Sequence, residues 1–240
     1  MSYGYEERTY SLSAAESPVS VRAEFITKTY IHLLGAVLGC VALTGLFMTV
    51  EPIRNGILSV MLAGGRLGIF AVMIGFMIVM WLCQKWAHES PRPGVQYAAL
   101  SIAVVGYSFL FAPLLYFAER FAPGVSVTAG ILTACIFAGL TAVVFMTRMD
   151  FSWLRPIFGI AFFAVLGMII ASFFVPITFG SWFFALMVLL ACAYILYDTS
   201  NVLHHYPPHM YVGAALELFM SVAMLFWDLV RLLMALQSND

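Results

Sequence analysis

Acidic residues inside apolar stretches are the first candidates for chemistry in this 240-residue sequence. Asp198 follows the apolar run 194–197, and Glu217 and Asp228 interrupt a second run near the end of the chain. Ser221 lies between these last two acids. On an α-helix, Glu217, Ser221 and Asp228 lie within roughly 40° of one another, on one face. Such a polar stripe can hold protons or cations, or its members can pair with neighbouring charges.

The composition indicates the surroundings of these acids. Hydrophobic residues make up 63% of the chain and charged residues 10%, the mean hydropathy is +0.98 and the net charge is −1. Ordinary soluble domains carry about 25% charged residues. These values exclude a soluble enzyme, a disordered chain and a nucleic-acid-binding domain. Continuous apolar runs of about 20 residues favour transmembrane helices over barrel strands. We therefore predict an all-α polytopic integral membrane protein whose partner is the lipid bilayer.

Seven transmembrane helices are expected, because proline, glycine and charged residues divide the apolar sequence at six places. Glu51-Pro52 closes the first span, and Pro176 with Gly180 separates the fifth from the sixth. We expect a polar N-terminal tail at 1–26, a seven-helix domain at 27–236 and a short tail at 237–240. The predicted spans are 28–50, 66–86, 95–117, 124–146, 156–175, 181–203 and 212–236.

The basic residues predict the orientation, because cytoplasmic loops carry an excess of Lys and Arg. The first 26 residues hold several charges and do not resemble a secretory signal, so the first span is expected to stay in the mature protein. If the N-terminus lies on the inner side of the membrane, seven basic residues lie on the inner side and four on the outer side. The inner ones are Arg8, Arg22, Lys28, Lys85, Arg92, Arg148 and Arg155, and the outer ones are Arg54, Arg66, Arg120 and Arg231.

Depth in the membrane separates the three acids. In this topology Asp198 and Glu217 both lie about five residues from the inner ends of their spans, so their carboxyls are nearly level. Asp228 lies roughly 16 Å further out. Two level carboxyls at low dielectric tend to share a proton and hold a path shut. Asp198 and Glu217 are also candidate contacts for a divalent cation, although the sequence predicts no firm metal site.

Structural alternatives remain open for each acid. Asp228 pairs equally well with Arg231, three residues on, and Glu217 is near enough to a span end to reach water. Asp198 is the hardest to explain structurally, since a charge at the bilayer centre costs about 2.5–3.5 kcal/mol on insertion scales. The short loop that holds His204, His205 and His209 favours solvated, pH-responsive histidines over a metal cluster.

The stretch 195–204, Ile-Leu-Tyr-Asp-Thr-Ser-Asn-Val-Leu-His, resembles the signature of the transmembrane Bax inhibitor motif (Bax inhibitor-1) family. The stretch 145–152, Phe-Met-Thr-Arg-Met-Asp-Phe-Ser, is similar to the loop that follows the family's fourth span. Gly106-Tyr107 and Ala112-Pro113-Leu114 resemble its third span. The resemblance covers roughly residues 25–236. It is closest to the bacterial branch whose members bind and restrain a membrane-anchored ATP-dependent protease, which implies a bacterial inner membrane and a cytoplasmic N-terminus.

What the resemblance implies is a pH-sensitive calcium leak gated by an acidic pair, one acid in span 6 and one in span 7. Asp198 matches the first acid. The second aligns with Ser221, so this chain departs from the pattern, and Glu217 on the same face is the better substitute than Asp228. Lys85 corresponds to the family's basic residue at the inner end of span 2. Lys85 and Arg231 are therefore the expected counter-charges, and the acid that some members carry in span 2 has no counterpart here.

Two classes of function follow from these observations. The first is a pH-sensitive calcium or cation leak channel with Asp198 in the gate, with Ca²⁺ as transported ion and no cofactor. The second is a non-conducting regulator that binds a membrane-anchored protease through its polar N-terminal tail. An enzyme is not expected, because the chain has no GxSxG and no HExxH motif. The sequence gives no indication of oligomeric state.

Overall fold

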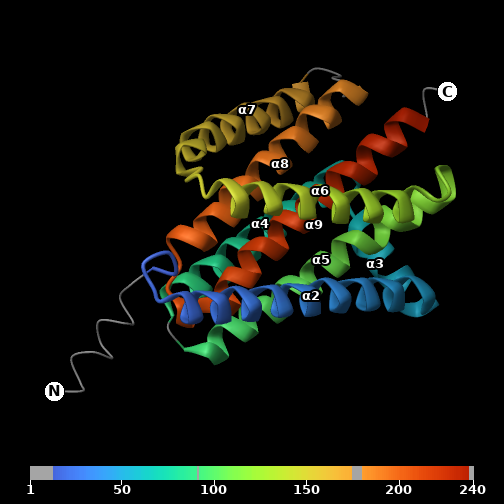
Figure 1. Ribbon diagram of the computed structural model, residues 1–240. Helices are drawn as coiled ribbons and strands as arrows, with labels where there is room; N and C mark the ends of the chain where they lie inside the picture. The colour runs from blue at the N-terminus through green and yellow to red at the C-terminus, as the bar shows by residue number, and fades with distance from the viewer. Residues whose placement is uncertain (1–12, 91, 175–179, 238–240) are drawn as a thin grey trace.

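The protein is a bundle of α-helices (Figure 1). The computed structural model describes residues 13–90, 92–174 and 180–237, and this part of the chain contains no strand. Two single-turn 3-10 helices, η1 (Ser152–Leu154) and η2 (Pro208–Met210), precede α7 and α9. The α-helices are α2 (Val19–Thr49), α3 (Glu51–Leu62), α4 (Gly65–Glu89), α5 (Pro93–Phe121), α6 (Val125–Thr147), α7 (Arg155–Phe174), α8 (Ser181–His204) and α9 (Tyr211–Gln237).

Seven helical segments in the described residues are long and apolar enough to cross a membrane, which confirms the predicted all-α polytopic architecture. They correspond to the seven predicted spans, with ends displaced by a few residues. The first starts earlier than expected, at Val19 rather than at 28. The start of α2 and the end of α9 lie at opposite ends of the bundle (Figure 1), as an odd number of spans requires.

Helix α3 is the element that the sequence did not predict. The sequence was expected to break between the first two spans, yet Glu51–Leu62 forms three further turns. Pro52 lies in the first turn, where its fixed φ favours a helix start, and Glu51 places a negative charge beside the helix N-terminus. The same dipeptide that ends one helix therefore begins the next.

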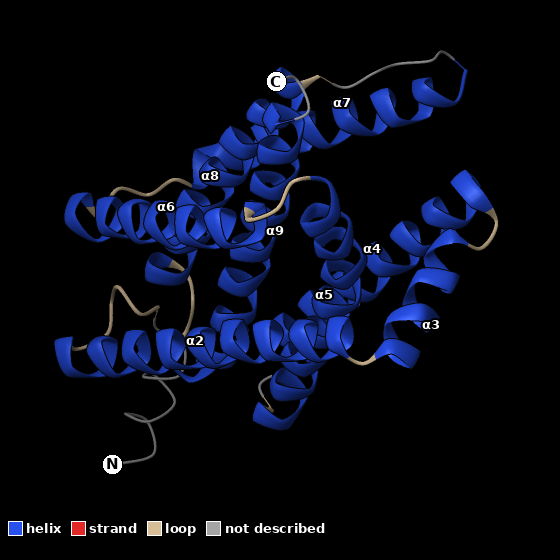
Figure 2. Cartoon of the chain, turned by 90° about the vertical axis from the view of Figure 1, so that its right-hand side faces the viewer, coloured by secondary structure: helices blue, strands red, loops and turns tan. Residues whose placement is uncertain are grey.

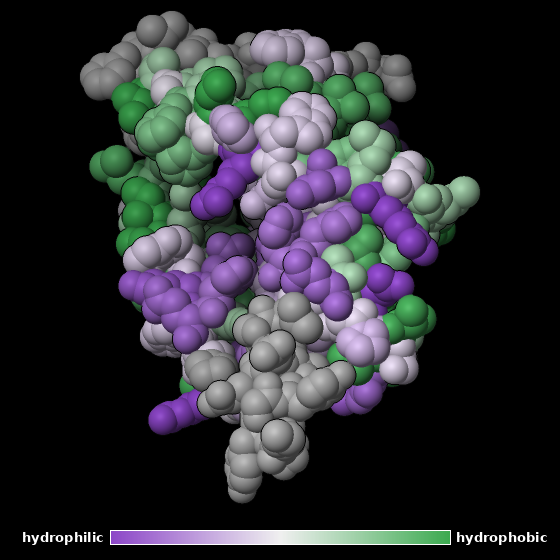
Figure 3. All heavy atoms as spheres, turned by 60° about the vertical axis from the view of Figure 1, so that its left-hand side comes forward, coloured by the Kyte–Doolittle hydropathy of each residue, from purple (hydrophilic) through white to green (hydrophobic). Residues whose placement is uncertain are grey.

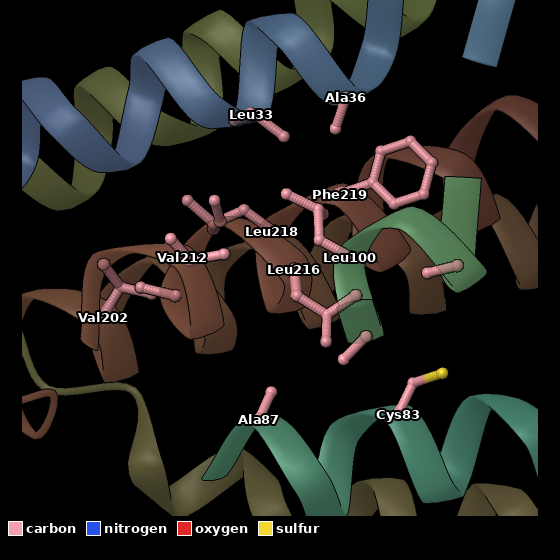
Figure 4. Packing of buried hydrophobic residues seen from close by; sticks show 14 of the residues in the cluster. Leu33, Ala36, Cys83, Ala87, Leu100, Val202, Val212, Leu216, Leu218 and Phe219 are labelled. Atoms are coloured by element: carbon pink, nitrogen blue, oxygen red, sulfur yellow. The ribbon is translucent and has the colours of Figure 1, made fainter. Parts of the chain in front are cut away.

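Helix α9 is the centre of the bundle. It packs most extensively against α8 and also contacts α2, α4, α5 and α6. Figure 4 shows why: Leu218 and Phe219 project towards α2 and α5, whereas Leu216 lies towards α4. Helix α7 is peripheral and lies at the edge of the bundle in Figure 2. Ser221 and Asp228 of α9, which are 4% and 5% exposed, are consequently surrounded by protein.

The junction of α4, α5 and α9 is fixed by a buried amide and a close helix approach. Gln96 is 1% exposed; its Nε2 donates to the Ser90 carbonyl at 3.1 Å, and its Oε1 accepts from the Gly213 amide at 3.2 Å. A Cβ at Gly213 would lie 3.3 Å from the Ala87 carbonyl oxygen, a tight contact that α4 or α9 would have to relieve by a small shift, so glycine favours this close approach of α9 to α4. This junction sets the distance between the helices that line the site described below.

The polar N-terminal segment is partly attached to the bundle. The Ala14 amide donates to the Tyr206 carbonyl at 2.9 Å, and Ala14 is fully buried. Residues 18–26 of the predicted tail include the start of α2, with Phe25 1% exposed. Residues 1–12 of that tail, the predicted break at Pro176, and residues 238–240 of the predicted C-terminal tail lie outside the described residues.

Candidate functional site at the junction of helices α8 and α9

Asp198 and Ser221 join α8 to α9 by a buried hydrogen bond. Ser221 Oγ donates to the Asp198 carboxyl, and the two residues are 4% and 5% exposed. The same hydroxyl lies 3.2 Å from the Glu217 carbonyl one turn back on α9. Ser221, which the resemblance aligns with the second acid of the expected pair, is therefore the direct partner of Asp198.

Glu217 is held one helical turn away, level with Asp198. Asn201 Nδ2 donates to Glu217 Oε1 at 2.9 Å. Glu217 Oε2 is enclosed and accepts no hydrogen bond from the described residues, although the Asp198 carboxyl and the Tyr206 hydroxyl are its neighbours. The structure thus brings Asp198, Glu217 and Ser221 into one polar network between two helices; with Asn201 we call these four residues the α8–α9 network.

The loop between α6 and α7 is bound to the end of α8. Ser200 Oγ accepts a hydrogen bond from the Phe151 amide at 2.9 Å and lies 3.2 Å from the Met149 carbonyl. Ser200 follows Asp198 by two positions, so the two stretches that carry the family resemblance contact each other. This contact ties the loop to the helix that carries the central carboxyl.

Asp150 in the same loop has two partners. Its Oδ1 accepts from the Ser152 amide at 2.9 Å, and its Oδ2 lies 3.8 Å from His205 Nε2. The hydrogen bond from the Ser152 amide, and secondarily the nearby His205, lower the pKa of Asp150 below the ordinary carboxyl range. Asp150 is therefore ionised over the physiological range and helps to fix the loop.

A cavity of approximately 250 Å³ lies between the end of α4 and the start of α9. Lys85 lies on its α4 wall, where its Nζ is 4.0 Å from Glu89 and 5.4 Å from the centre of the Trp81 ring. Figure 3 looks towards this end of the molecule and shows hydrophilic side chains gathered there. Lys85 and Glu217 thus face one space. The cavity is lined by Trp81, Gln84, Lys85, Ala87, His88, Tyr206, Gly213, Leu216 and Glu217.

Tyr206 and His88 form a pair that the sequence reasoning missed. The Tyr206 hydroxyl lies 3.1 Å from His88 Nδ1, and the two rings meet edge to face at 5.0 Å. Burial, together with the neighbouring Glu217, raises the pKa of Tyr206 well above its ordinary value. Its hydroxyl therefore keeps its proton. No sequence signal links these residues, which are separated by 118 positions.

Asp228 and Arg231 are separate from the network. Asp228 is 5% exposed, and within the described residues neither a hydrogen bond nor an ion pair reaches its carboxyl, with Arg231 as its charged neighbour. Arg231 lies 4.6 Å above the Phe184 ring. The fully buried Ile195 and Leu225 belong to an apolar cluster in the intervening helix turns. Apolar packing therefore separates the α8–α9 network from Asp228.

The sequence was expected to place His204 in a loop, but His204 is the last residue of α8, and His205 follows it. His204 Nδ1 lies 2.9 Å from the Ser200 carbonyl, and His205 faces Asp150. His209 lies in η2. Across residues 13–90, 92–174 and 180–237, no group of three or more His, Cys, Asp or Glu side chains is arranged to hold a metal ion.

Comparison with known proteins gives matches over nearly the whole chain. The family model described as Inhibitor of apoptosis-promoting Bax1 matches residues 22–239. Protein lifeguard 4 of Mus musculus is 28% identical over 245 residues, which cover 98% of this chain and 94% of that protein. Bax inhibitor 1 of Schizosaccharomyces pombe is 28% identical over 94% of this chain and 82% of its own length. An uncharacterized protein of Pseudomonas aeruginosa is 30% identical over 68% of this chain and 73% of its own length.

Proposed function

The chain belongs to the Bax inhibitor-1 family of integral membrane proteins, and from that premise we propose that it is a pH-sensitive calcium or cation leak channel with Asp198 in its gate. The observation that carries this proposal is the buried hydrogen bond from Ser221 to Asp198, which links α8 to α9. A titratable group that joins two membrane-crossing helices couples proton binding to their separation. This is the arrangement that a proton-controlled gate requires.

The gate works by the charge on the α8–α9 network. With a proton bound, the neighbouring carboxyls of Asp198 and Glu217 carry at most one negative charge, and the hydrogen bonds of Ser221 and Asn201 hold α8 against α9. Loss of that proton puts two like charges side by side at low dielectric, which is strongly unfavourable. The helices then separate, water enters, and the two carboxylates can contact a cation. Ca²⁺ is the transported ion that this oxygen-rich site favours.

The closed path has an entrance and a barrier. The cavity lined by Lys85 and Glu217 supplies the entrance from one side, with Lys85 as counter-charge. The buried side chains of Ile195 and Leu225 supply the barrier between the network and Asp228. Asp228 and Arg231 would lie on the far side of that barrier. Opening therefore requires movement of α8 relative to α9 and not only a change of side-chain conformation.

The experiment is calcium flux into liposomes that contain the purified protein and an entrapped calcium dye, at mildly acidic and mildly alkaline pH. The wild-type chain is expected to leak more at the higher pH. Asp198→Asn keeps the side-chain size but cannot lose a proton, so its flux should be the same at both pH values. Asp228→Asn is the matched control and should keep the wild-type profile. An unchanged pH profile in a folded Asp198→Asn protein contradicts the assignment of the gate.

The second candidate function is a non-conducting regulator of a membrane-anchored ATP-dependent protease. The observation that favours it is the attachment of the N-terminal segment through Ala14 to the Tyr206 loop, beside the network. Absence of calcium flux from the folded wild-type protein would favour this function over the first. Deletion of residues 1–20 should then release the protease, and unchanged turnover of the protease's substrates would count against the regulator.

For the cellular setting, we propose a bacterial inner membrane with a cytoplasmic N-terminus. The excess of basic residues on the predicted inner side supports this orientation. Cysteine-accessibility labelling at position 16, in the attached N-terminal segment, tests it in sealed vesicles of known orientation. The cavity and the α8–α9 network would then lie near the cytoplasmic surface.

A further inference from the structure

The cavity beside Glu217 has walls of opposite charge. Helix α4 contributes the ammonium of Lys85, and helix α9 contributes the carboxyl of Glu217. The ion pair between Lys85 and Glu89 is long, at 4.0 Å, and largely exposed, so it holds the ammonium weakly. Lys85 therefore retains donors for an anion in the cavity. A ligand matched to both walls carries one negative and one positive group.

The position of the cavity favours a lipid headgroup as this ligand. Lys85 lies in the last two turns of a membrane-crossing helix, between Trp81 and Trp86, which are 58% and 46% exposed. Exposed tryptophan and lysine at the end of a span are typical of the membrane–water interface. Lys85 and Trp81 belong to the wall of the cavity. The cavity thus lies at headgroup depth, with an exposed indole at its edge.

The size of the cavity limits the ligand. Its volume of approximately 250 Å³ is below the range of about 300–1,000 Å³ that is usual for drug-sized ligands. It is several times larger than the roughly 30 Å³ that one water occupies in the liquid. The volume of a phosphate ester with a short amine arm is comparable to that of the cavity, whereas an acyl chain must remain outside in the bilayer.

The aromatic side chains of the cavity indicate which amine is preferred. A quaternary ammonium is recognised by free aromatic faces, but Lys85 already lies over the Trp81 ring, and the Tyr206 ring packs on His88. A primary ammonium instead uses its N–H groups as donors, and the Glu217 carboxyl on the opposite wall has one oxygen, Oε2, that accepts no hydrogen bond from the described residues. The cavity therefore favours an ethanolamine headgroup over a choline headgroup.

We propose that this cavity binds the headgroup of a phospholipid that carries a primary amine, with the phosphate at Lys85 and the ammonium towards Glu217. The bound lipid would bridge α4 and α9 at the entrance to the network. This inference goes beyond the proposed channel function and does not depend on it, because lipid binding requires no ion flow. A measurement of lipid binding that does not involve ion flux therefore distinguishes a failure of this proposal from a failure of the proposed channel function.

Native mass spectrometry of the purified full chain tests the proposal. The protein is incubated with an equimolar mixture of phosphatidylethanolamine, its N,N-dimethyl derivative, phosphatidylcholine and phosphatidylglycerol, all with the same acyl chains. We expect retention of phosphatidylethanolamine to exceed that of phosphatidylcholine roughly tenfold, the ratio that one charge-assisted hydrogen bond supplies. Equal retention of the two, or preferential retention of phosphatidylglycerol, overturns the proposal without the need for any variant.

Two lysines of the chain give a matched pair of variants. Lys85→Gln should lower retention of phosphatidylethanolamine roughly tenfold. Lys28 resembles Lys85, with a glutamate partner one turn away at 2.7 Å and an aromatic ring at 5.4 Å, but it is not part of the cavity. Lys28→Gln should therefore leave retention unchanged. Equal loss in both variants overturns the assignment to the cavity.

Two further experiments test whether Glu217 recognises the amine and whether the ligand is a lipid or a free phosphate compound. Glu217→Gln should reduce the preference for phosphatidylethanolamine over phosphatidylcholine, while thermal unfolding in phosphatidylcholine micelles verifies the fold. Free O-phosphoethanolamine in excess should not displace the lipid, because the bilayer-anchored headgroup has the higher local concentration. Displacement by the free compound at equal concentration would overturn the lipid as ligand, and an unchanged preference in folded Glu217→Gln would overturn the role of Glu217.

Discussion

Helix α9 carries two acids, the partly buried Glu217 and the buried Asp228, that differ in their partners. At one, Ser221 and Glu217 are bonded across to Asp198 and Asn201 of α8. At the other, two helical turns further on, Asp228 is buried but receives no hydrogen bond from the described residues. Both positions lie on one face of one helix, and each has charged groups nearby. Only the first links two helices through polar contacts.

The difference shows that burial alone does not identify an acid that can control a conformational change. A buried carboxyl with a cross-helix donor stabilises one helix arrangement in one protonation state, whereas a buried carboxyl without such a donor mainly adds a desolvation cost. In the proposed gate, the α8–α9 network would convert proton binding into movement of α8. Asp228 has no comparable hydrogen bond to another helix within the described residues. The predictions below test this contrast from its largest consequence to its smallest.

Loss of the donor to Asp198 is expected to have the largest effect on stability. Ser221→Ala leaves a buried carboxyl without the hydroxyl that now donates to it, which should lower the free energy of unfolding by about 2–3 kcal/mol. Thr133→Val is the control: Thr133 is 5% exposed, but its hydroxyl donates to the Ala129 carbonyl of its own helix. Its loss should be under about 1 kcal/mol. Denaturant titration in mixed micelles measures both, and equal losses would remove the distinction.

Loss of the donor to Glu217 should have the next largest effect. Asn201→Ala removes the 2.9 Å hydrogen bond to Oε1 and should cost about 1.5–2 kcal/mol, since the acceptor is a carboxyl. The matched control is Thr199→Val on the same helix, because Thr199 Oγ1 is buried without a hydrogen-bond partner in the described residues. That substitution should be neutral or stabilising in the same titration. A cost for Thr199→Val that equals the cost for Asn201→Ala would mean that packing, not hydrogen bonding, holds α8 to α9.

Much of this contrast follows from the sequence. Long apolar runs predict the seven spans, because each run is long enough to cross the hydrocarbon core of a bilayer as a helix. The periodicity of α9 and the positions of the span ends predict that Asp198 and Glu217 are level and that Asp228 is distant. These are consequences of helical geometry within single elements, and they need no knowledge of how the helices pack.

The remaining features depend on packing between distant segments. The sequence pairs Asp198 with an acid on α9, but the direct donor is Ser221, because the rotation of α9 against α8 decides which side chain faces the partner. The Tyr206–His88 pair and the docking of Phe151 on Ser200 join residues far apart in the chain. Helix α3 was missed because a proline after a span indicates an end, although the same proline can occupy the first turn of a new helix.

The loop contact beside the network predicts a smaller, pH-dependent effect. Asp150 has a lowered pKa because the Ser152 amide donates to it. Its charge therefore stabilises the loop above the ordinary carboxyl range, and this contribution disappears as the pH falls through the lowered pKa. At neutral pH, Asp150→Asn should reduce the hydrogen-exchange protection of the Phe151 amide by up to about 1 kcal/mol, because the side chain is 46% exposed.

The difference between Asp150→Asn and the wild-type protein should vanish in acid, where both side chains are neutral. Exchange rates corrected for the intrinsic effect of pH give this comparison directly. Asp150→Asn keeps an oxygen for the Ser152 amide, so it isolates the charge from the hydrogen bond. A difference in protection between the variant and the wild-type protein that is constant over the whole pH range would assign the effect to the shape of the side chain.

The smallest effect is expected at the isolated acid. Asp228→Asn removes a charge that Arg231 stabilises and that burial destabilises. The loss of the attraction to Arg231 and the relief of the desolvation cost therefore oppose each other. The free energy of unfolding should change by less than about 0.5 kcal/mol. Denaturant titration of this variant beside Ser221→Ala tests the contrast within one helix. A loss from Asp228→Asn as large as that from Ser221→Ala would mean that Asp228 also holds a partner across the bundle, and the gate would then have to extend over both positions.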